Sequence, residues 1–204
     1  KDFEKLENVI KEEHPEIIFH LAAQAIVRKS YDIPLDTFAT NIMGTANLLQ
    51  AAKKINCVKS IVIITTDKVY ENDFSGRAYK EGDCLGGYDP YGASKAAADI
   101  VSQSYIRSFF NPDKFGLTHQ TLSAIARSGN VIGGGDWGED RIVPDIIKSI
   151  YERKERIKIR NPKSIRPWQH VFEPLSGYLA LGQRLYCGEK DLVGVWNFGS
   201  NPKD

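Results

Sequence analysis

The chain has 204 residues, and its 27 lysines and arginines nearly balance its 26 aspartates and glutamates, giving a net charge of +1 with histidine neutral. This length predicts one domain, or one domain and part of a second. With 42% hydrophobic and 26% charged residues, the composition is that of a soluble globular protein and excludes an intrinsically disordered chain. The balanced charge argues against nucleic-acid binding, and no apolar run approaches the roughly 18 residues of a membrane span.

The cysteines and the chain ends bear on location and completeness. Cys57, Cys84 and Cys187 are too far apart for a metal-binding spacing or a disulfide framework, which favours a reducing cytoplasm. The charged, amphipathic segment 1–13 does not resemble a signal peptide. The chain does not begin with Met, and 201–204 reads as the start of a loop, so we expect a piece of a longer protein.

Helical and strand-like segments alternate along the first part of the chain. Some stretches place apolar residues at helical spacing, whereas others are short continuous apolar runs, which are typical of strands buried on both faces of a sheet. This alternation predicts an α/β fold with a Rossmann-like, doubly wound, mainly parallel sheet. We expect helices at 3–13, 34–54 and 91–110, and strands at 17–21, 61–64 and 121–127.

The pattern changes after residue 128. A glycine-rich loop at 129–137 is followed by a predicted helix at 142–153, a short strand near 157–159 and a helix at 174–186. We therefore divide the chain into a partial dinucleotide-binding domain, 1–128, and part of a smaller α/β substrate-binding region, 129–204. The glycines at 133–135 are not a dinucleotide fingerprint, which needs a strand before it and a helix after it. We expect that fingerprint, and the first strands of the sheet, upstream of residue 1.

Two segments carry the chemistry. Thr66 follows a buried strand, and Tyr91 and Lys95 lie one turn apart near the start of a helix, on the same helical face. An ammonium beside a phenol favours the phenolate and lowers the pKa of the tyrosine, which makes it a usable base. Ligands of open parallel sheets bind at the carboxyl ends of the strands. A lone Tyr-x-x-x-Lys is common and a strand-ending Thr is ordinary, so the catalytic interpretation depends on their combination.

Six segments of the chain resemble the extended short-chain dehydrogenase/reductases that act on nucleotide sugars, the NAD-dependent epimerase/dehydratase family. The first four fit many epimerases and dehydratases, whereas the last two are more specific and resemble the CDP-glucose 4,6-dehydratase branch. The segments are His20-Leu21-Ala22-Ala23-Gln24, Asn41-Ile42-Met43-Gly44-Thr45, Thr66-Asp67-Lys68-Val69-Tyr70, Tyr88-Asp89-Pro90-Tyr91-Gly92-Ala93-Ser94-Lys95, Gly129 through Trp137, and Arg166-Pro167-Trp168-Gln169-His170-Val171.

The resemblance implies a lyase of deoxysugar biosynthesis in which NAD acts as an internal hydride shuttle. Tyr91 would take the proton of the sugar 4-hydroxyl while hydride leaves C4, Thr66 would hydrogen-bond to the 4-oxygen, and Lys95 would orient the nicotinamide ribose. The resulting 4-ketone acidifies the C5 proton, water leaves across C5–C6, and hydride returns to C6. The expected product is a 4-keto-6-deoxy sugar that remains attached to its nucleotide.

The two residues after Thr66 distinguish branches of the family. Asp67 would protonate the departing 6-hydroxyl. The related dTDP-glucose dehydratases have Glu at the next position as the C5 base, whereas this chain has Lys68, as the CDP-glucose branch does. A lysine acts as a base only when neutral, so Lys68 either abstracts the C5 proton or stabilises enolate charge. A solvated loop lysine is the alternative.

The resemblance implies further contacts. Small residues after the first strand let the backbone approach the dinucleotide, although simple packing explains them as well. Asn130 could instead be a turn residue, Arg166 a surface arginine, and the two tryptophans core residues, while Asn41 is expected to be structural. The implied cofactor-binding residues are Leu21, Ala22, Ala23, Thr65, Tyr91 and Lys95, the substrate-binding residues are Gln24, Asn130 and Arg166, Trp137 and Trp168 could pack against the pocket, and no metal site is expected.

Other functions remain open at this point. A 4-epimerase or reductase would also use Tyr91 and Lys95 but needs no acid for elimination at C6. A non-catalytic interaction domain could keep the same fold. The family resemblance also implies a homodimer of the full-length protein, formed by the helices at 34–54 and 91–110.

Overall fold

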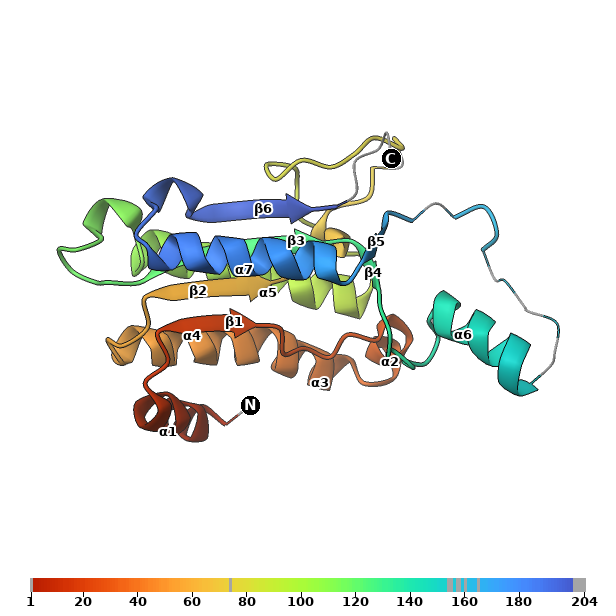
Figure 1. The fold of residues 1–204 in the computed structure, drawn as a ribbon, viewed down its shortest axis with the longest axis horizontal. Coiled ribbons are helices and arrows are strands. Elements are labelled where there is room, and N and C mark those ends of the chain that lie inside the picture. The colour runs from red at the N-terminus through yellow and green to blue at the C-terminus, as the bar shows by residue number, and fades with distance from the viewer. Residues whose placement is uncertain are drawn as a thin grey trace.

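The main sheet of the computed structural model is parallel throughout (Figure 1). In the part of the chain that the structure describes, its four strands follow the order β1–β2–β3–β6. The described residues are 2–73, 75–153, 156, 159, 161–164 and 166–199. The strands are β1 (Ile17–His20), β2 (Ser60–Ile64), β3 (Leu122–Ser128) and β6 (Gly194–Phe198). The predicted parallel sheet is thus confirmed, and β6 is a strand that the sequence pattern did not predict.

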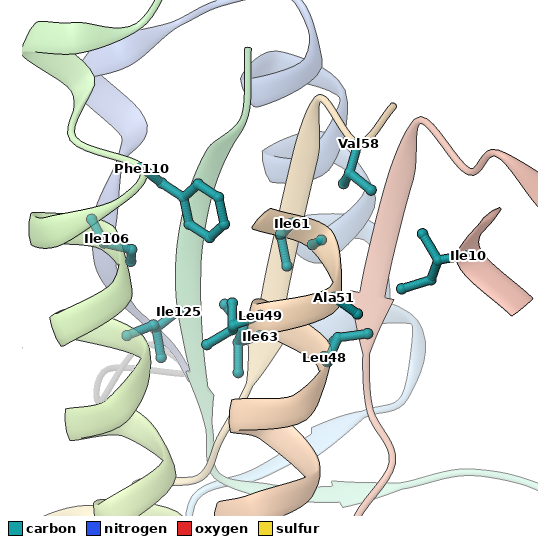
Figure 2. Packing of buried hydrophobic residues seen from close by; sticks show 11 residues of the cluster. Ile10, Leu48, Leu49, Ala51, Val58, Ile61, Ile63, Ile106, Phe110 and Ile125 are labelled. Atoms are coloured by element: carbon teal, nitrogen blue, oxygen red, sulfur yellow. The ribbon is translucent and has the colours of Figure 1, made fainter. Parts of the chain in front are cut away.

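Helices cover both faces of this sheet, which confirms the doubly wound architecture. Helices α1 (Phe3–Glu13), α4 (Gly44–Lys54) and α5 (Pro90–Ser108) lie on one face, and α7 (Phe172–Tyr186) lies on the other (Figure 1). Alternate residues of each strand therefore enter different cores. Ile61 and Ile63 pack with α4 and α5, whereas Val62 packs under α7. Figure 2 shows the first of these cores.

Helix α7 lies very close to the sheet because of one glycine. A Cβ on Gly182 would lie 2.6 Å from the Phe19 ring and 3.6 Å from a Val62 methyl group. The hydroxyl of Ser60 donates to the Gly182 carbonyl at 2.9 Å. The absence of a side chain therefore lets a helix backbone bond directly to a central strand.

The helix predicted at 34–54 is interrupted. It consists of α3 (Pro34–Phe38), a π-helical turn (Ala39–Met43) and α4. Asn41 lies in the π turn, is buried, and uses its amide group to bond other elements, which explains why a poor helix former occurs there. A short helix, α2 (Val27–Asp32), precedes α3 and was not predicted.

The region after residue 128 forms a small second sheet before the chain returns to the main one. Strand β4 (Asn130–Ile132) pairs in parallel with β5 (Trp168–His170), so the predicted glycine-rich loop begins as a strand. Between them, α6 (Ile142–Lys148) continues into a π-helical turn, Ser149–Arg153. Residues 157 and 158 of the expected strand near 157–159 lie outside the described residues. Helix α7 packs on the main sheet and β6 is one of its strands, so the main sheet includes residues beyond 128.

Three short 3₁₀ helices complete the described elements: Asp67–Val69, Pro112–Lys114 and Lys190–Leu192. The first directly follows β2 and its two threonines, so the chain turns at the carboxyl edge of the sheet. Among the described residues, no helix has the length and apolar character that crossing a membrane requires.

Candidate active site

Tyr91 is fixed by the way in which α5 begins. Asp89 caps the helix by accepting a hydrogen bond from the Gly92 backbone N–H at 2.9 Å, and Pro90 occupies the first turn. A Cβ on Gly87 would lie 2.0 Å from the Gly92 carbonyl carbon, so the preceding loop packs backbone to backbone against this turn. The Tyr91 N–H also donates to the hydroxyl of Ser30, which is fully buried in α2. The tyrosine backbone is therefore held from three directions.

The Thr66 hydroxyl reaches the Tyr91 phenol, as the sequence predicted. Thr66 follows β2, is buried, and its hydroxyl hydrogen-bonds to the phenolic oxygen. Burial raises the pKa of Tyr91, and the hydrogen bond from Thr66 and the charge of Arg141 act in the opposite direction. The carboxylates of Asp67 and Asp89 raise that pKa further. The tyrosine thus has the partner expected of it but is protonated in this environment.

Lys95 is buried one turn after Tyr91 and donates from Nζ to the Ile64 carbonyl oxygen at 2.7 Å. Burial lowers the pKa of Lys95 to about 8, and the carboxylate of Asp99 opposes this shift. The sequence argument expected Lys95 to lower the Tyr91 pKa. That expectation is wrong for this arrangement, because the ammonium is directed at the strand end and burial of the phenol dominates.

Asp67 lies where the two parts of the molecule meet. Its Oδ1 accepts from the Thr66 hydroxyl at 3.1 Å. A Cβ on Gly129 would lie 3.4 Å from Asp67 Oδ2 and 2.9 Å from the ring of Pro167, so two further segments come close to this carboxylate. Lys68 is half-buried in the same 3₁₀ turn. A carboxylate and an ammonium therefore follow the threonine at the open edge of the sheet.

Asn41 connects the loop after β1 to α5. Its Oδ1 accepts from the Gln24 N–H at 2.8 Å, and its Nδ2 donates to the Gln24 carbonyl at 3.1 Å and to Ser94 Oγ at 2.8 Å. This bears out the structural role expected of Asn41. The Gln24 side chain is itself engaged, because Nε2 donates to Thr37 Oγ1 and Oε1 accepts from the Ile26 N–H.

The expected cofactor-binding residues lie at the carboxyl ends of β1 and β2. Leu21 and Ala22 are exposed and Ala23 is half-buried, so backbone and small side chains face the open edge. The Thr65 hydroxyl donates to Asp99 Oδ2 at 3.2 Å and its N–H donates to the Ala126 carbonyl at 2.8 Å. Thr65 is therefore buried structure next to the site. No group of three or more potential metal ligands occurs among the described residues.

The expected substrate-binding residues beyond β3 lie on the small sheet and beside it. Asn130 is half-buried in β4, opposite Trp168 in β5, and Arg166 is exposed just before β5. Trp168 is 38% exposed and Trp137 is 52% exposed, so neither is a core residue. The backbones next to Asn130 and Arg166 come together at Asp67.

Sequence reasoning missed two charged or titratable groups at the site. His20 ends β1, and its Nε2 is 3.0 Å from Thr45 Oγ1. Burial lowers the pKa of His20 to about 4, and the nearby charge of Lys95 acts in the same direction. Arg141, before α6, is close enough to Tyr91 to lower its pKa. A histidine at the carboxyl end of a predicted parallel strand was a signal that could have been followed.

The amino-acid sequence matches known proteins along its length. The model of the GDP-mannose 4,6 dehydratase family matches residues 1–186. A CDP-glucose 4,6-dehydratase of Salmonella typhimurium is 50% identical over 204 residues, which are 100% of this chain and 56% of that protein. A dTDP-D-glucose 4,6-dehydratase of Dictyostelium discoideum is 28% identical and covers 98% of this chain and 44% of its own length. The chain thus spans about half the length of these relatives.

The fold is shared with solved structures of lower identity. A UDP-glucuronic acid 4-epimerase from Bacillus cereus, solved with UDP-glucuronic acid and NAD, superposes with a TM-score of 0.80. Its identity is 22%, and the match covers 98% of this chain and 59% of that one. At this identity the likeness concerns the fold alone. The family match over residues 1–186 shows that the chain belongs to the GDP-mannose 4,6 dehydratase family.

Proposed function

We propose that these residues form the catalytic part of a nucleotide-sugar 4,6-dehydratase that converts CDP-glucose into CDP-4-keto-6-deoxyglucose. The observation that carries the proposal is the adjacency of three groups at the carboxyl end of β2: the Tyr91 phenol, the Thr66 hydroxyl and the Asp67 carboxylate. The choice of CDP-glucose is supported by the 50% identical Salmonella relative and by Lys68 after Asp67.

The residues at the open edge fit a nicotinamide dinucleotide. Beyond β1, the exposed Ala22 leaves room for a ligand to approach the backbone. A lysine ammonium has three N–H donors, and in the described part of the chain the Ile64 carbonyl takes one from Lys95. Lys95 and Tyr91 would therefore hold the nicotinamide ribose. The chemistry that NAD would supply there is reversible hydride transfer, first from C4 of the sugar and later to C6.

Proton transfer at the sugar 4-oxygen is assigned to Tyr91. Its oxygen accepts the proton of the 4-hydroxyl, while Thr66, which already hydrogen-bonds to the phenol, shares the same oxygen of the substrate. Because burial raises the pKa of Tyr91, the phenolate needs positive charge nearby. Arg141, whose charge acts to lower that pKa, is the cation that we propose for this purpose.

Elimination across C5–C6 is assigned to the 3₁₀ turn after β2. Asp67 would donate a proton to the departing 6-hydroxyl, which leaves as water. Lys68, on the same turn, would remove the C5 proton or stabilise the enolate that forms. Asp67 is half-buried and Gly129 lies beside its carboxylate, so the loop that leads into β4 covers part of this proposed acid.

The remaining predicted contacts follow from this assignment. We propose that Asn130 and Arg166, which flank the backbones that meet at Asp67, bind the diphosphate, a task suited to the planar guanidinium. Gln24 would contact the sugar only through the part of its amide that the loop leaves available. Residues 1–128 would supply the dinucleotide-binding part and 129–204 the substrate-binding part. Within 129–204, α7 and β6 would serve both parts, because α7 packs on the main sheet and β6 is one of its strands.

We also propose a homodimer. Helices α3 and α5 and the π turn between α3 and α4 expose large apolar side chains: Leu35 is 82% exposed, Met43 55% and Ile100 55%. Exposed large apolar side chains on elements that pack against one another favour a protein–protein interface there. Sedimentation of the complete gene product at micromolar concentration should give a dimer, and a monomer would contradict the proposal.

The test uses CDP-glucose carrying deuterium at C4, NAD and the complete gene product. A 4,6-dehydratase moves the deuterium to C6 and forms a 4-keto product that absorbs in strong base. Mass spectrometry and NMR follow both changes. A galactose-configured product that keeps deuterium at C4 would contradict elimination and establish the 4-epimerase alternative, whose fold is the same.

A further inference from the structure

A buried ion pair lies directly behind the Tyr91–Lys95 pair. Asp99 is on α5, one turn after Lys95, and Arg127 is on β3. Arg127 Nε donates to Asp99 Oδ2 and Nη2 donates to Oδ1, both at 2.8 Å, so the pairing is bidentate. Their side chains are 1% and 0% exposed. Such burial is costly unless every polar group is satisfied, which makes the pair an unusual element of an otherwise apolar core.

The same helical face binds the end of β2 twice. Lys95 donates to the Ile64 carbonyl at 2.7 Å, and one turn later Asp99 accepts from the Thr65 hydroxyl at 3.2 Å. One turn earlier, Tyr91 meets Thr66. Three successive turns of α5 thus contact three neighbouring residues, Ile64, Thr65 and Thr66, at one strand end. Any shift of Asp99 along the axis of α5 would also change the distance between the Tyr91 phenol and the Thr66 hydroxyl.

Arg127 extends the arrangement to the loop beyond the site. Its Nη1 donates to the Tyr70 phenol at 2.9 Å and to the Glu81 carbonyl at 3.0 Å. Tyr70 in turn donates to Asn197 Oδ1 in β6 at 2.6 Å. One guanidinium therefore joins the catalytic helix, the loop after Asp67 and the neighbouring strand.

We propose that Asp99 and Arg127 form a positioning pair for the catalytic residues: Arg127 fixes the Asp99 carboxylate, and Asp99, through its hydrogen bond from Thr65, holds α5 in register with the end of β2. This inference rests on the proposed roles of Tyr91 and Lys95. Neither member of the pair touches substrate. The Asp99–Arg127 pair affects the reaction only through Lys95 and through the position of Thr65.

The charges around Lys95 allow a specific test. His20 from β1 and Asp99 from α5 are titratable groups whose interaction with the Lys95 charge the structure gives, and Arg127 pairs with Asp99. Asp99 opposes the lowering of the Lys95 pKa that burial causes, and His20 is neutral above its pKa of about 4. Removal of the Asp99 charge should therefore lower the Lys95 pKa below about 8.

The experiment compares two variants of the complete gene product. The double variant Asp99→Asn/Arg127→Gln replaces the ion pair by a neutral hydrogen-bonding pair, so no buried charge is left alone. Arg127→Lys keeps both charges but loses the bidentate geometry. Lys95 is titrated by NMR of Cε-labelled lysine without substrate or NAD, and thermal unfolding reports the fold.

We expect the double variant to fold, with a Lys95 titration midpoint below about 8 and a kcat lower by roughly 10- to 100-fold at little-changed KM. Arg127→Lys should lose stability and keep its midpoint near 8. A folded double variant with an unchanged Lys95 midpoint and an unchanged kcat would overturn the proposal. A Lys95 midpoint that falls in both variants in proportion to their loss of stability would overturn it too. Asp99→Asn/Arg127→Met replaces the double variant if the glutamine version does not fold.

The outcome separates this inference from the proposed function. A lower Lys95 midpoint in the double variant, together with no product from CDP-glucose in the unaltered protein, would refute the dehydratase assignment and keep the positioning role. Product formation in the unaltered protein, together with an unchanged Lys95 midpoint in the double variant, would keep the dehydratase assignment and refute the positioning role.

Discussion

The residues around Tyr91 and those around β4 and β5 meet at Asp67, but they are held in place differently. Tyr91, Lys95 and Thr66 are fixed by capping, by backbone contact and by hydrogen bonds to buried groups of the main sheet. The residues of the small sheet are half-buried or exposed except Gln169, which is buried. Gln169 links the small sheet to the main one, because it donates to Ser128 Oγ at 3.0 Å and to the Phe198 carbonyl at 3.2 Å.

This difference separates the proposed proton-transfer groups from the proposed contacts to the substrate diphosphate. The proton-transfer groups depend on a rigid sheet edge, where small shifts are costly. The proposed diphosphate contacts lie on an exposed segment that can change without disturbing the core. Relatives named for CDP-glucose and dTDP-glucose are similar to this chain, which agrees with the proposal that the substrate contacts lie apart from the proton-transfer groups.

The largest expected effect comes from Tyr91 on the rigid side. Tyr91→Phe should lower kcat by roughly 10²- to 10⁴-fold, because it removes the proposed base while it keeps the buried ring. Steady-state kinetics on CDP-glucose with NAD measures this. Tyr31→Phe, at a tyrosine that is 57% exposed, is the matched control and should retain activity. Unchanged turnover in Tyr91→Phe would remove the catalytic assignment.

The second effect concerns pH and His20. The folded-state pKa of about 4 lies below the ordinary value of 6.5, so the unfolded chain binds more protons between these values. Stability should therefore fall as pH drops from 6.5 to 4, by about 3 kcal/mol from this group. Urea unfolding across this range measures it. His20→Gln should flatten the dependence, and an equally steep loss in that variant would show that other groups are responsible.

A smaller effect is expected at the connection between the β1 loop and α5. Asn41→Ala removes its bonds to the Gln24 backbone and to Ser94, so we expect a loss of roughly 2 kcal/mol in the free energy of unfolding. Chemical denaturation gives the value. A change within about 0.5 kcal/mol would mean that water replaces the amide without penalty.

The smallest effect on stability is expected on the substrate side. Arg166→Lys should raise KM for CDP-glucose by about tenfold, because a bidentate phosphate contact is lost, and should change stability by less than about 0.5 kcal/mol. Kinetics and thermal unfolding separate the two. Lys163→Ala, at an exposed position nearby, is the control. A loss of stability comparable to that of Asn41→Ala would abolish the contrast between the two sides.

The sequence by itself determined the parallel sheet and the pairing of Thr66 with Tyr91. Both follow from local signals: apolar runs of strand length, a threonine directly after one of them, and a spacing that puts Tyr91 and Lys95 on the same helical face. Only the tertiary structure decided what Lys95 faces, that Arg127 is paired inside the core, and that β6 returns to the main sheet. These depend on contacts between residues far apart in the chain, and neither periodicity nor residue type records which distant partner a buried charge will find.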